Sequence, residues 1–496
     1  TLGKVSTRNY SYEDLAKEIN IHTGGINYDV LSLAQNGKDG EFLPKLLVRS
    51  KALTDKLPKL MELLQEVVTG SVFEDTGRLR EIIQETRSRM EMYINQSGHL
   101  MAMNRLSSYF FASGKYTELS SGIAYYHFLN KLEQNFEAKS KEIAENLKRT
   151  AQLIFHKNAL IAGITLPEKD YPAFARVFEE FADNLPKKEA PPAPFSFTEE
   201  PLNEGLLTPS KIQYVAKGYS YIRMGYEYSG KFQVLRTIAN LDYLWNRVRV
   251  QGGAYGVSVT FTRSGMMLFS SYRDPNLKET LKAYDEIASY LANFEADERE
   301  MQKYIIGTIS RLDTPLTPQM KGERADINFF TGLSQEDIQK ERDEVLSTSS
   351  KDIKALSQMA ADVLKNEYLC VLGSEGKIQE NRDLFKNLIN VFELIKKQES
   401  LEVLKNIERF EISDCLTIKS LIKGEFEVSK SGRFSSTMKE SSNVNDTSNL
   451  QLKILSKNIK EKDFVIKENG EIVNVVSQSG ILTSKTSNML KVKSDI

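Results

Sequence analysis

The chain is poor in the side chains that most often bind metals. It has only four histidines and two cysteines among 496 residues. The histidines are His22, His99, His127 and His156, each tens of residues from the next. A helical zinc site needs two imidazoles one turn apart and a nearby carboxylate, as in H-E-x-x-H or H-x-x-E-H. Neither pattern occurs, so we expect isolated histidines and no metal bound by this chain.

The usual patterns of nucleophilic catalysis are also missing. Cys370 and Cys415 form neither a disulfide framework nor a Cys-x-x-Cys pair, which favours unpaired thiols in a reducing compartment. No G-x-S-x-G elbow is present. The run from Gly373 to Lys377 resembles a phosphate-binding loop, but it lacks that loop's glycine spacing and a serine or threonine after the lysine. We interpret it as a turn.

A strong net charge and a long apolar run are both lacking. Lys plus Arg, 66 residues, balance Asp plus Glu, 67 residues, so no global field attracts nucleic acid or anionic membrane. No stretch approaches the roughly 18 apolar residues of a membrane span, and no secretory pattern opens the chain. These absences predict a soluble, unexported chain without nucleic-acid or membrane partners. Because it opens on Thr1 inside a helical pattern, we expect its natural start upstream.

Proline is concentrated where the chain divides. Residues 184–205 contain five prolines and no helical periodicity, between amphipathic segments on both sides. This composition predicts a linker over 184–205 between a first domain over 1–183 and a second over 206–397. Residues 398–496 are rich in Lys, Ser, Asn and Ile, which predicts a tail that is partly disordered or weakly β.

Hydrophobic periodicity predicts a mixture of helices and strands. Before the linker we expect a helix over 56–68 and a longer helical segment over 78–108, broken at Ser97-Gly98. After the linker we expect a strand over 211–216, a helix over 231–248, a hairpin of 254–262 with 266–272, and a helix capped by Asp274-Pro275. The pattern indicates an α+β fold with an antiparallel-rich sheet packed against helices.

Two parts of the sequence echo each other. A predicted strand over 158–165 and helix over 174–181 resemble a strand over 366–374 and helix over 384–392. A Gly-Gly pair followed by a strand-like stretch also occurs once in each part. Within its own part of the chain, the first pair is preceded by fewer residues than the second pair is within its part. We therefore expect two homologous α+β domains, of which the first lacks its opening strand.

The densest chemical signal lies in residues 244–256, LWNRVRVQGGAYG. A predicted helix carrying Arg247 and Arg249 ends at Gly252-Gly253, and Tyr255 begins the next strand. Such a bend can direct a guanidinium and a phenol into one cleft, where both can donate hydrogen bonds to a carbonyl oxygen or oxyanion. The alternative is a plain helix stop with a solvated arginine and an edge tyrosine. Spacing alone leaves both open.

Four runs carry a family resemblance. They are SGHLMAM (97–103), DYLWNRVRVQGGAYG (242–256), SYRDPNLKET (271–280) and TISRLDTPLTPQMKGERA (308–325). Together they resemble the carboxy-terminal half of insulinase-type (pitrilysin, inverted-zincin) zinc peptidases of the presequence-protease branch. The resemblance implies four α/β domains in two bowl-like halves that close around an unfolded peptide. It also implies that the amino-terminal half, absent here, binds the zinc through H-x-x-E-H and a further glutamate.

The resemblance assigns roles to individual residues. Arg249 and Tyr255 match the family's R-x-Q-G-G-A-Y order as the catalytic arginine and tyrosine. Arg247 is the competing arginine. The substrate-binding residues implied are Arg247, Gly252, Gly253 and Ala254.

We therefore expect the substrate-enclosing half of a zinc metalloendopeptidase for short unstructured peptides, inactive alone and dependent on an amino-terminal half. The alternative is a non-catalytic peptide-binding or scaffold subunit. The expected location is the bacterial cytoplasm, or else an organellar matrix.

Overall fold

The computed structural model describes residues 1–187, 195, 197–200 and 203–392, and beyond them only the backbone of several strands. The chain forms two compact units, Thr1–Phe392 and Glu393–Ile496. In the second unit the described strands are β9 (Arg409–Glu411), β10 (Cys415–Lys419), β11 (Glu425–Val428), β12 (Arg433–Thr437), β13 (Leu452–Lys453), β14 (Phe464–Ile466), β15 (Ile472–Ser477), β16 (Gly480–Lys485) and β17 (Met489–Ser494). They form sheets ordered β10-β17-β16-β15-β14 and β13-β11-β12-β9. The disorder expected in the tail concerns residues outside the described part.

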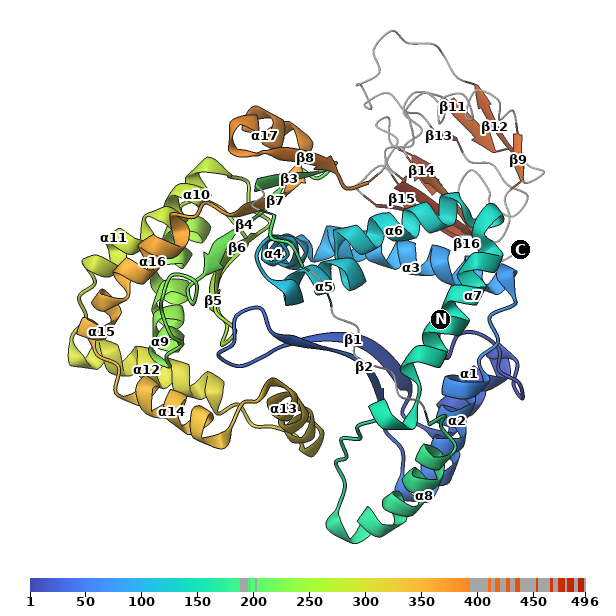
Figure 1. Cartoon of the computed structure of the whole chain (residues 1–496). Coiled ribbons are helices and arrows are strands. Elements are labelled where there is room, and N and C mark those ends of the chain that lie inside the picture. Colours follow the sequence, from blue (N-terminus) through green and yellow to red (C-terminus); the bar gives the residue numbers. More distant parts are fainter. Residues whose placement is uncertain are drawn as a thin grey trace. The chain divides into compact units, whose positions relative to one another are not determined.

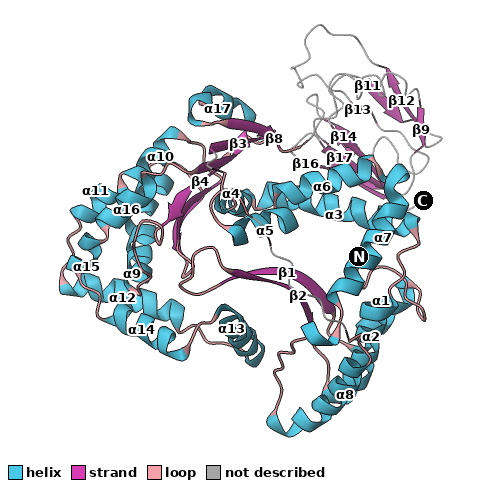
Figure 2. Cartoon of the chain, viewed as in Figure 1, coloured by secondary structure: helices cyan, strands magenta, loops and turns pink. Residues whose placement is uncertain are grey.

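Helices dominate the first part of the larger unit (Figures 1 and 2). Its elements are α1 (Tyr12–His22), β1 (Ile26–Ala34), β2 (Phe42–Ser50), η1 (Thr54–Lys56), α2 (Leu57–Gly70), α3 (Thr76–Gln96), α4 (Gly98–Ser107), α5 (Ala112–Ser121), α6 (Ile123–Gln134), α7 (Phe136–Ile154), η2 (Lys157–Ala159), η3 (Glu168–Asp170) and α8 (Tyr171–Asp183). Proline in the first turn of α2 suits a helix start, because its missing N–H would have no partner there. The predicted helices over 56–68 and 174–181 are confirmed, and Ser97 separates α3 from α4 as expected.

A six-stranded sheet organises the second part. Its elements are β3 (Asn203–Thr208), β4 (Gln213–Ser220), α9 (Lys231–Ile238), η4 (Ala239–Tyr243), η5 (Trp245–Val250), β5 (Gly256–Phe261), β6 (Met266–Tyr272), α10 (Lys278–Asp285), α11 (Ile287–Ala292), α12 (Glu298–Leu312), α13 (Pro318–Thr331), α14 (Gln335–Leu346), α15 (Ser350–Ala355), α16 (Ser357–Leu364), β7 (Leu369–Ser374), α17 (Glu375–Glu380), η6 (Arg382–Leu384) and β8 (Asn387–Asn390). The sheet order is β5-β6-β4-β7-β3-β8. Only β3 pairs in parallel, with β7 and β8. The α+β class with an antiparallel-rich sheet is confirmed.

Helix α4 joins the two parts by packing across β4, β6 and β7 of this sheet. It buries Met101, Ala102 and Leu106 in the same core as the sheet residues Val215 and Phe269. Fully buried apolar side chains such as these each contribute roughly 1.5–3 kcal/mol to folding. The helix that contains all of the run 97–103 except Ser97 is therefore packed firmly against the sheet.

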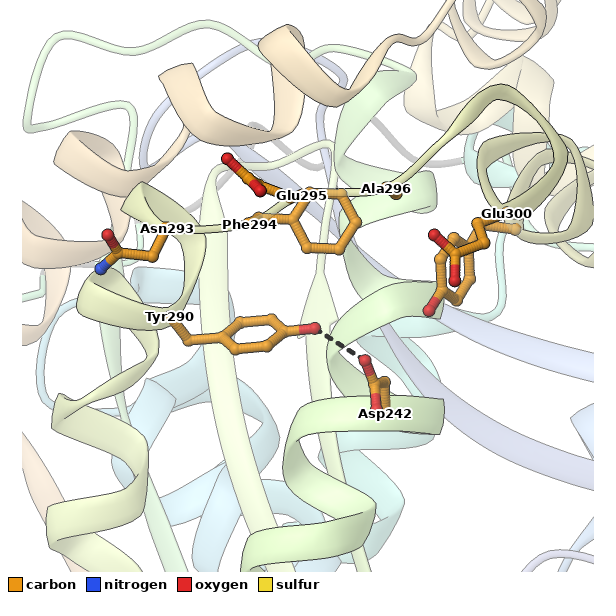
Figure 3. Close-up of a pocket in the computed structure, with 8 residues that line it drawn as sticks. Asp242, Tyr290, Asn293, Phe294, Glu295, Ala296 and Glu300 are labelled. Atoms are coloured by element: carbon orange, nitrogen blue, oxygen red, sulfur yellow. Dashed lines mark hydrogen bonds between the residues drawn. The ribbon is translucent and has the colours of Figure 1, made fainter.

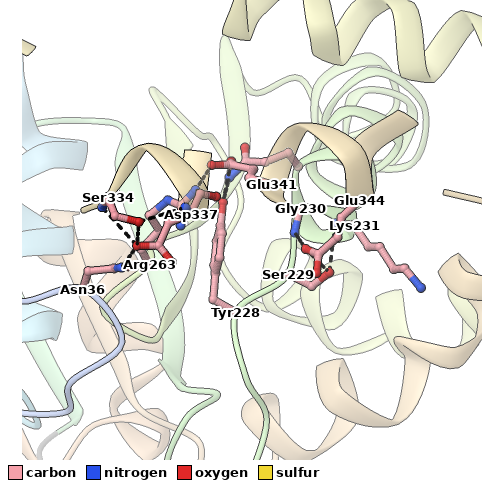
Figure 4. A network of polar contacts seen from close by, with 11 residues as sticks. Asn36, Tyr228, Ser229, Gly230, Lys231, Arg263, Ser334, Asp337, Glu341 and Glu344 are labelled. Carbon is pink, nitrogen blue, oxygen red and sulfur yellow. Dashed lines mark hydrogen bonds and ion pairs between the residues drawn. The ribbon is translucent and has the colours of Figure 1, made fainter. Parts of the chain in front are cut away.

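The tip of the β1–β2 hairpin is held by a polar network (Figure 4). Asn36 donates its side-chain N–H to Asp337 Oδ2 at 3.3 Å, at the start of α14. Arg263, in the turn between β5 and β6, is ion-paired with Glu341 and lies 4.6 Å from the ring centre of Tyr228. The Tyr228 hydroxyl donates to the same glutamate at 2.7 Å. The Asn36 bond therefore ties the hairpin to α14, and the contacts of Arg263 and Tyr228 hold α14 against the rest of the second part.

Two predicted elements were wrong. The strand predicted over 158–165 is absent: Asn158 and Ala159 belong to η2, and residues 160–165 have no strand beside them in the described part of the chain, with Ile161 and Ile164 exposed. The helix predicted over 384–392 is absent, and the strand β8 (Asn387–Asn390) lies there instead. The apolar run suits either structure, and pairing with β3 satisfies the backbone of the strand.

One predicted cap was also wrong. Asp274 does not cap a helix, because α10 begins only at Lys278. The buried Asp274 carboxylate instead accepts hydrogen bonds from the Asn276 N–H and the Thr280 hydroxyl, at 2.9 and 2.8 Å.

The division into domains over 1–183 and 206–397 stays a prediction. Most of the predicted linker, residues 188–194, 196 and 201–202, lies outside the described residues. At its end β3 begins at Asn203, inside the range expected for the linker. The first part carries only the two-stranded β1–β2 sheet, against six strands in the second.

Candidate active site

The predicted helix over 231–248 is longer than expected and changes its winding along its length. Its first turns are the α-helix α9, and η4 and η5 continue it to Val250 with the wider π-type winding. Such π-turns are frequent at functional sites. The helix ends as predicted, because Gly253 adopts φ +80° and its N–H donates to the Arg249 carbonyl at 2.9 Å.

The two candidate arginines have different partners. Arg247 is ion-paired with Glu286, and both side chains are about half-exposed. The Arg249 guanidinium carbon lies 4.1 Å from the ring centre of Trp245 and 5.5 Å from that of Tyr255. No ion pair involves Arg249 within the described residues. Arg247 therefore donates to a carboxylate through Nη2, whereas Arg249 lies over an aromatic ring and has no carboxylate partner within the described residues.

Tyr255 stands at the open end of the bend. Its side chain is 65% exposed, while its N–H is bonded to the Tyr272 carbonyl at 3.1 Å. The Tyr255 and Tyr272 rings meet edge to face, with centres 5.8 Å apart. The phenol is thus held at its base by β6 and presents its hydroxyl to solvent beside Arg249.

The run 97–103 lies against Tyr272 and the neighbouring Tyr214. The His99 imidazole packs edge to face on Tyr272, with ring centres 4.9 Å apart. At Gly98 a Cβ would approach the Tyr214 ring to 2.3 Å, so only glycine fits there. Burial lowers the pKa of His99. The sequence alone placed His99 among isolated histidines, and the edge-to-face contact joins it to the candidate site from a distant part of the chain.

The predicted substrate-binding backbone is largely engaged within the chain. Ala254 is buried, and its N–H donates to the Val248 carbonyl at 3.1 Å. The Gly252 carbonyl accepts from the Asn276 side chain at 2.5 Å. These bonds shape the bend that carries Tyr255. A role of Gly252, Gly253 or Ala254 in holding substrate stays a prediction.

A shallow cavity of about 290 Å³ includes one residue, Asp242, of the helical segment that carries the site (Figure 3). It is lined by Asp242, Tyr290, Asn293, Phe294, Glu295, Ala296, Glu300 and Tyr304. Its three carboxylates already have partners: Asp242 accepts from the Tyr290 hydroxyl at 2.9 Å, Glu300 caps α12, and Glu295 pairs with Lys354. Internal partners explain these side chains without a ligand.

The described residues contain no group of three or more His, Cys, Asp or Glu that can hold a metal ion. His22, His127 and His156 lie apart, beside Glu18, the Val391 carbonyl and the buried core respectively. A zinc site therefore does not fit the described part of this chain. Cys370 is a buried free thiol in β7, as expected, and the side chain of Cys415 lies outside the described residues. Among described helices, none is long and apolar enough to cross a membrane.

Two family models match the chain. The model of the domain associated with M16 peptidases of subfamily C matches residues 1–132, and the model described as "PreP C-terminal domain" matches residues 203–374. The second match contains the whole of the candidate site except His99, which lies in the first.

Curated relatives cover most of this chain. "Protein HypA" of Clostridium perfringens is 43% identical over 390 residues, which are 79% of this chain and 40% of that protein. "Presequence protease 1, chloroplastic/mitochondrial" of Arabidopsis thaliana is 31% identical over 75% of this chain and 34% of that protein. The chain thus spans well under half the length of these relatives. A peptidase M16 inactive domain from Pseudomonas fluorescens, a solved structure, is 16% identical with a TM-score of 0.47, over 75% of this chain and 85% of that one.

Proposed function

Because this chain belongs to the pitrilysin-type (insulinase-family) peptidases, as the carboxy-terminal half of a presequence-protease relative, we propose that it is the substrate-enclosing, transition-state-assisting half of a zinc metalloendopeptidase. Its substrates are short unstructured peptides, in keeping with the name of the plant relative, a presequence protease. The zinc belongs to an amino-terminal half, since the described residues of this chain do not fit a zinc site.

One observation carries the proposal: Arg249 and Tyr255 converge at the end of a single helix-to-strand bend, with the guanidinium 5.5 Å from the phenol ring. Tyr255 is exposed, and no carboxylate is paired with Arg249 among the described residues. Both groups can therefore donate hydrogen bonds to one acceptor brought to this surface. Arg247 is less suited, because Glu286 already accepts from it.

The chemistry that these donors assist is attack on a peptide carbonyl. Negative charge develops on the carbonyl oxygen as the carbon becomes tetrahedral, so a donor aimed at that oxygen stabilises the transition state more than the ground state. The Tyr255 hydroxyl and an Arg249 N–H supply two such donors. A bend held by internal hydrogen bonds needs little reorganisation during the reaction.

The test is Tyr255→Phe in the peptidase assembled from this chain and an amino-terminal half of the Clostridium perfringens relative. Phenylalanine keeps the edge-to-face contact with Tyr272 and removes only the hydroxyl. Loss of one oxyanion donor lowers kcat about 100- to 1000-fold in other enzymes, with KM little changed. An unchanged kcat would remove Tyr255 from the mechanism.

The competing function is a non-catalytic peptide-binding or scaffold subunit. The two functions are distinguished by measuring peptide hydrolysis with added zinc, first by the chain alone and then by the chain mixed with the amino-terminal half. Activity in the mixture only is the expected result. Activity of the chain alone would contradict the proposed division of labour, and peptide binding without hydrolysis in the mixture would favour the scaffold. A cytoplasmic or organellar location stays a prediction.

A further inference from the structure

Trp245 is the only tryptophan in the chain, and 41% of its surface is exposed. It begins η5, four residues before Arg249 on the same helical segment. The guanidinium carbon of Arg249 lies 4.1 Å from the centre of its ring, which is the contact distance of stacked planes. A large aromatic side chain that stays partly in water forgoes part of the free energy of burial. Its position at this helix end therefore calls for an explanation.

Stacking holds an arginine without using its hydrogen bonds. A guanidinium that lies on an aromatic face is attracted by the ring's negative face, while its N–H donors point outward in the plane. An ion pair does the opposite, as in Arg247, whose N–H groups face Glu286. For an arginine that must donate to substrate, an aromatic support restricts the side chain and keeps its donors free.

Two aromatic rings lie close to the Arg249 charge and can give it such a support. Trp245 lies 4.1 Å away, Tyr255 lies 5.5 Å away, and Tyr255 is itself held by Tyr272. We infer that Trp245 is a positioning residue, which holds the Arg249 guanidinium beside Tyr255 for hydrogen bonding to the peptide carbonyl. This inference rests on the proposed function of Arg249.

The contact itself can be measured on the chain alone, because all tryptophan emission comes from Trp245. Arg249→Ala uncovers one ring face, so the acrylamide quenching constant should rise toward that of free tryptophan. Arg247→Ala, two residues earlier, is the matched control and should leave quenching unchanged. Equal quenching of the wild-type and Arg249→Ala chains would overturn the stacked arrangement.

The catalytic consequence is measured in the peptidase assembled with the amino-terminal half. Trp245→Leu keeps an apolar side chain but removes the ring face, and we expect kcat to fall about two- to fivefold with KM little changed. Trp245→Phe, which restores an aromatic face, should recover most of that loss. Leu241→Ala, an exposed residue one turn earlier, is the control and should not change kcat.

A double variant separates this inference from the function on which it rests. If Trp245 acts only through Arg249, Trp245→Leu should cause no further loss in an Arg249→Ala background. An additive loss would contradict the inference. An unchanged kcat in Arg249→Ala would refute the proposed function itself. A lowered kcat in Arg249→Ala with full activity in Trp245→Leu would refute the role of Trp245 alone.

Discussion

A buried ionic cluster between α4 and β3 leads to a strong stability prediction. The Arg105 guanidinium donates to both oxygens of Glu204, at 2.6 and 3.1 Å, and to Glu118 Oε1 at 3.2 Å. The Tyr109 hydroxyl also donates to Glu204, at 2.8 Å. The side chains of Glu118 and Glu204 are 0% and 2% exposed, and that of Arg105 is 16% exposed. One cation therefore compensates two carboxylates that water does not reach.

Arg105→Met should destabilise the larger unit by about 3–5 kcal/mol at pH 7, because it leaves buried carboxylates without their cation. Methionine fills similar volume, so the loss reports the charge and not a cavity. The matched control is Arg80→Met, since the Arg80 pair with Glu137 is largely exposed and should contribute at most about 1 kcal/mol. Urea denaturation followed by circular dichroism measures both.

The same variant should depend on pH in a defined direction. Burial raises the pKa of Glu118 above its ordinary 4.5, an effect that Arg105 opposes. Without Arg105 the folded state holds this proton more tightly than the unfolded state, so the free energy of unfolding should fall as pH rises above about 4.5. The penalty should thus be smaller near pH 5 than at pH 7. A loss under 1 kcal/mol at pH 7, or a penalty that grows on acidification, would refute the reasoning.

Two further predictions concern the candidate site. Because the pKa of His99 lies below its ordinary 6.5, the free energy of unfolding of the wild type should fall as pH drops below about 6.5. His99→Gln should lose that dependence. The same change in the free energy of unfolding from pH 7 to 5 in both proteins would contradict this. Gly253→Ala forces alanine to φ +80° and should cost about 1–2 kcal/mol. Gly256→Ala is its control, because that Cβ would meet Tyr272 at an ordinary 3.5 Å; equal denaturation midpoints would count against the bend.

Short-range structural features could be predicted from the sequence alone. The glycine pair at 252–253 predicted a helix end, because glycine has no Cβ and adopts the left-handed conformation that ends many helices. Gly253 has that conformation. The break at Ser97-Gly98 and the hairpin of β5 with β6 were likewise predictable from short-range patterns. The family resemblance needed only the order of residues in four runs.

Strand assignment depended on partners that the sequence does not display. Residues 158–165 and 384–392 both carry apolar runs compatible with more than one structure. Part of the second run forms β8 because it pairs with β3, whereas the first run has no neighbouring strand among the described residues. A strand exists only where another strand completes its hydrogen bonds.

The tertiary structure also decided the surroundings of the candidate site. The family's residue order favoured Arg249 over Arg247 but did not display their surroundings, and only folding places Glu286 beside Arg247 and Trp245 beside Arg249. His99 likewise looked isolated until α4 packed on the sheet and brought it to Tyr272. Spacing along a chain determines which residues share a turn, but contacts between distant elements arise only when the core is packed, and those contacts decide which donors stay free.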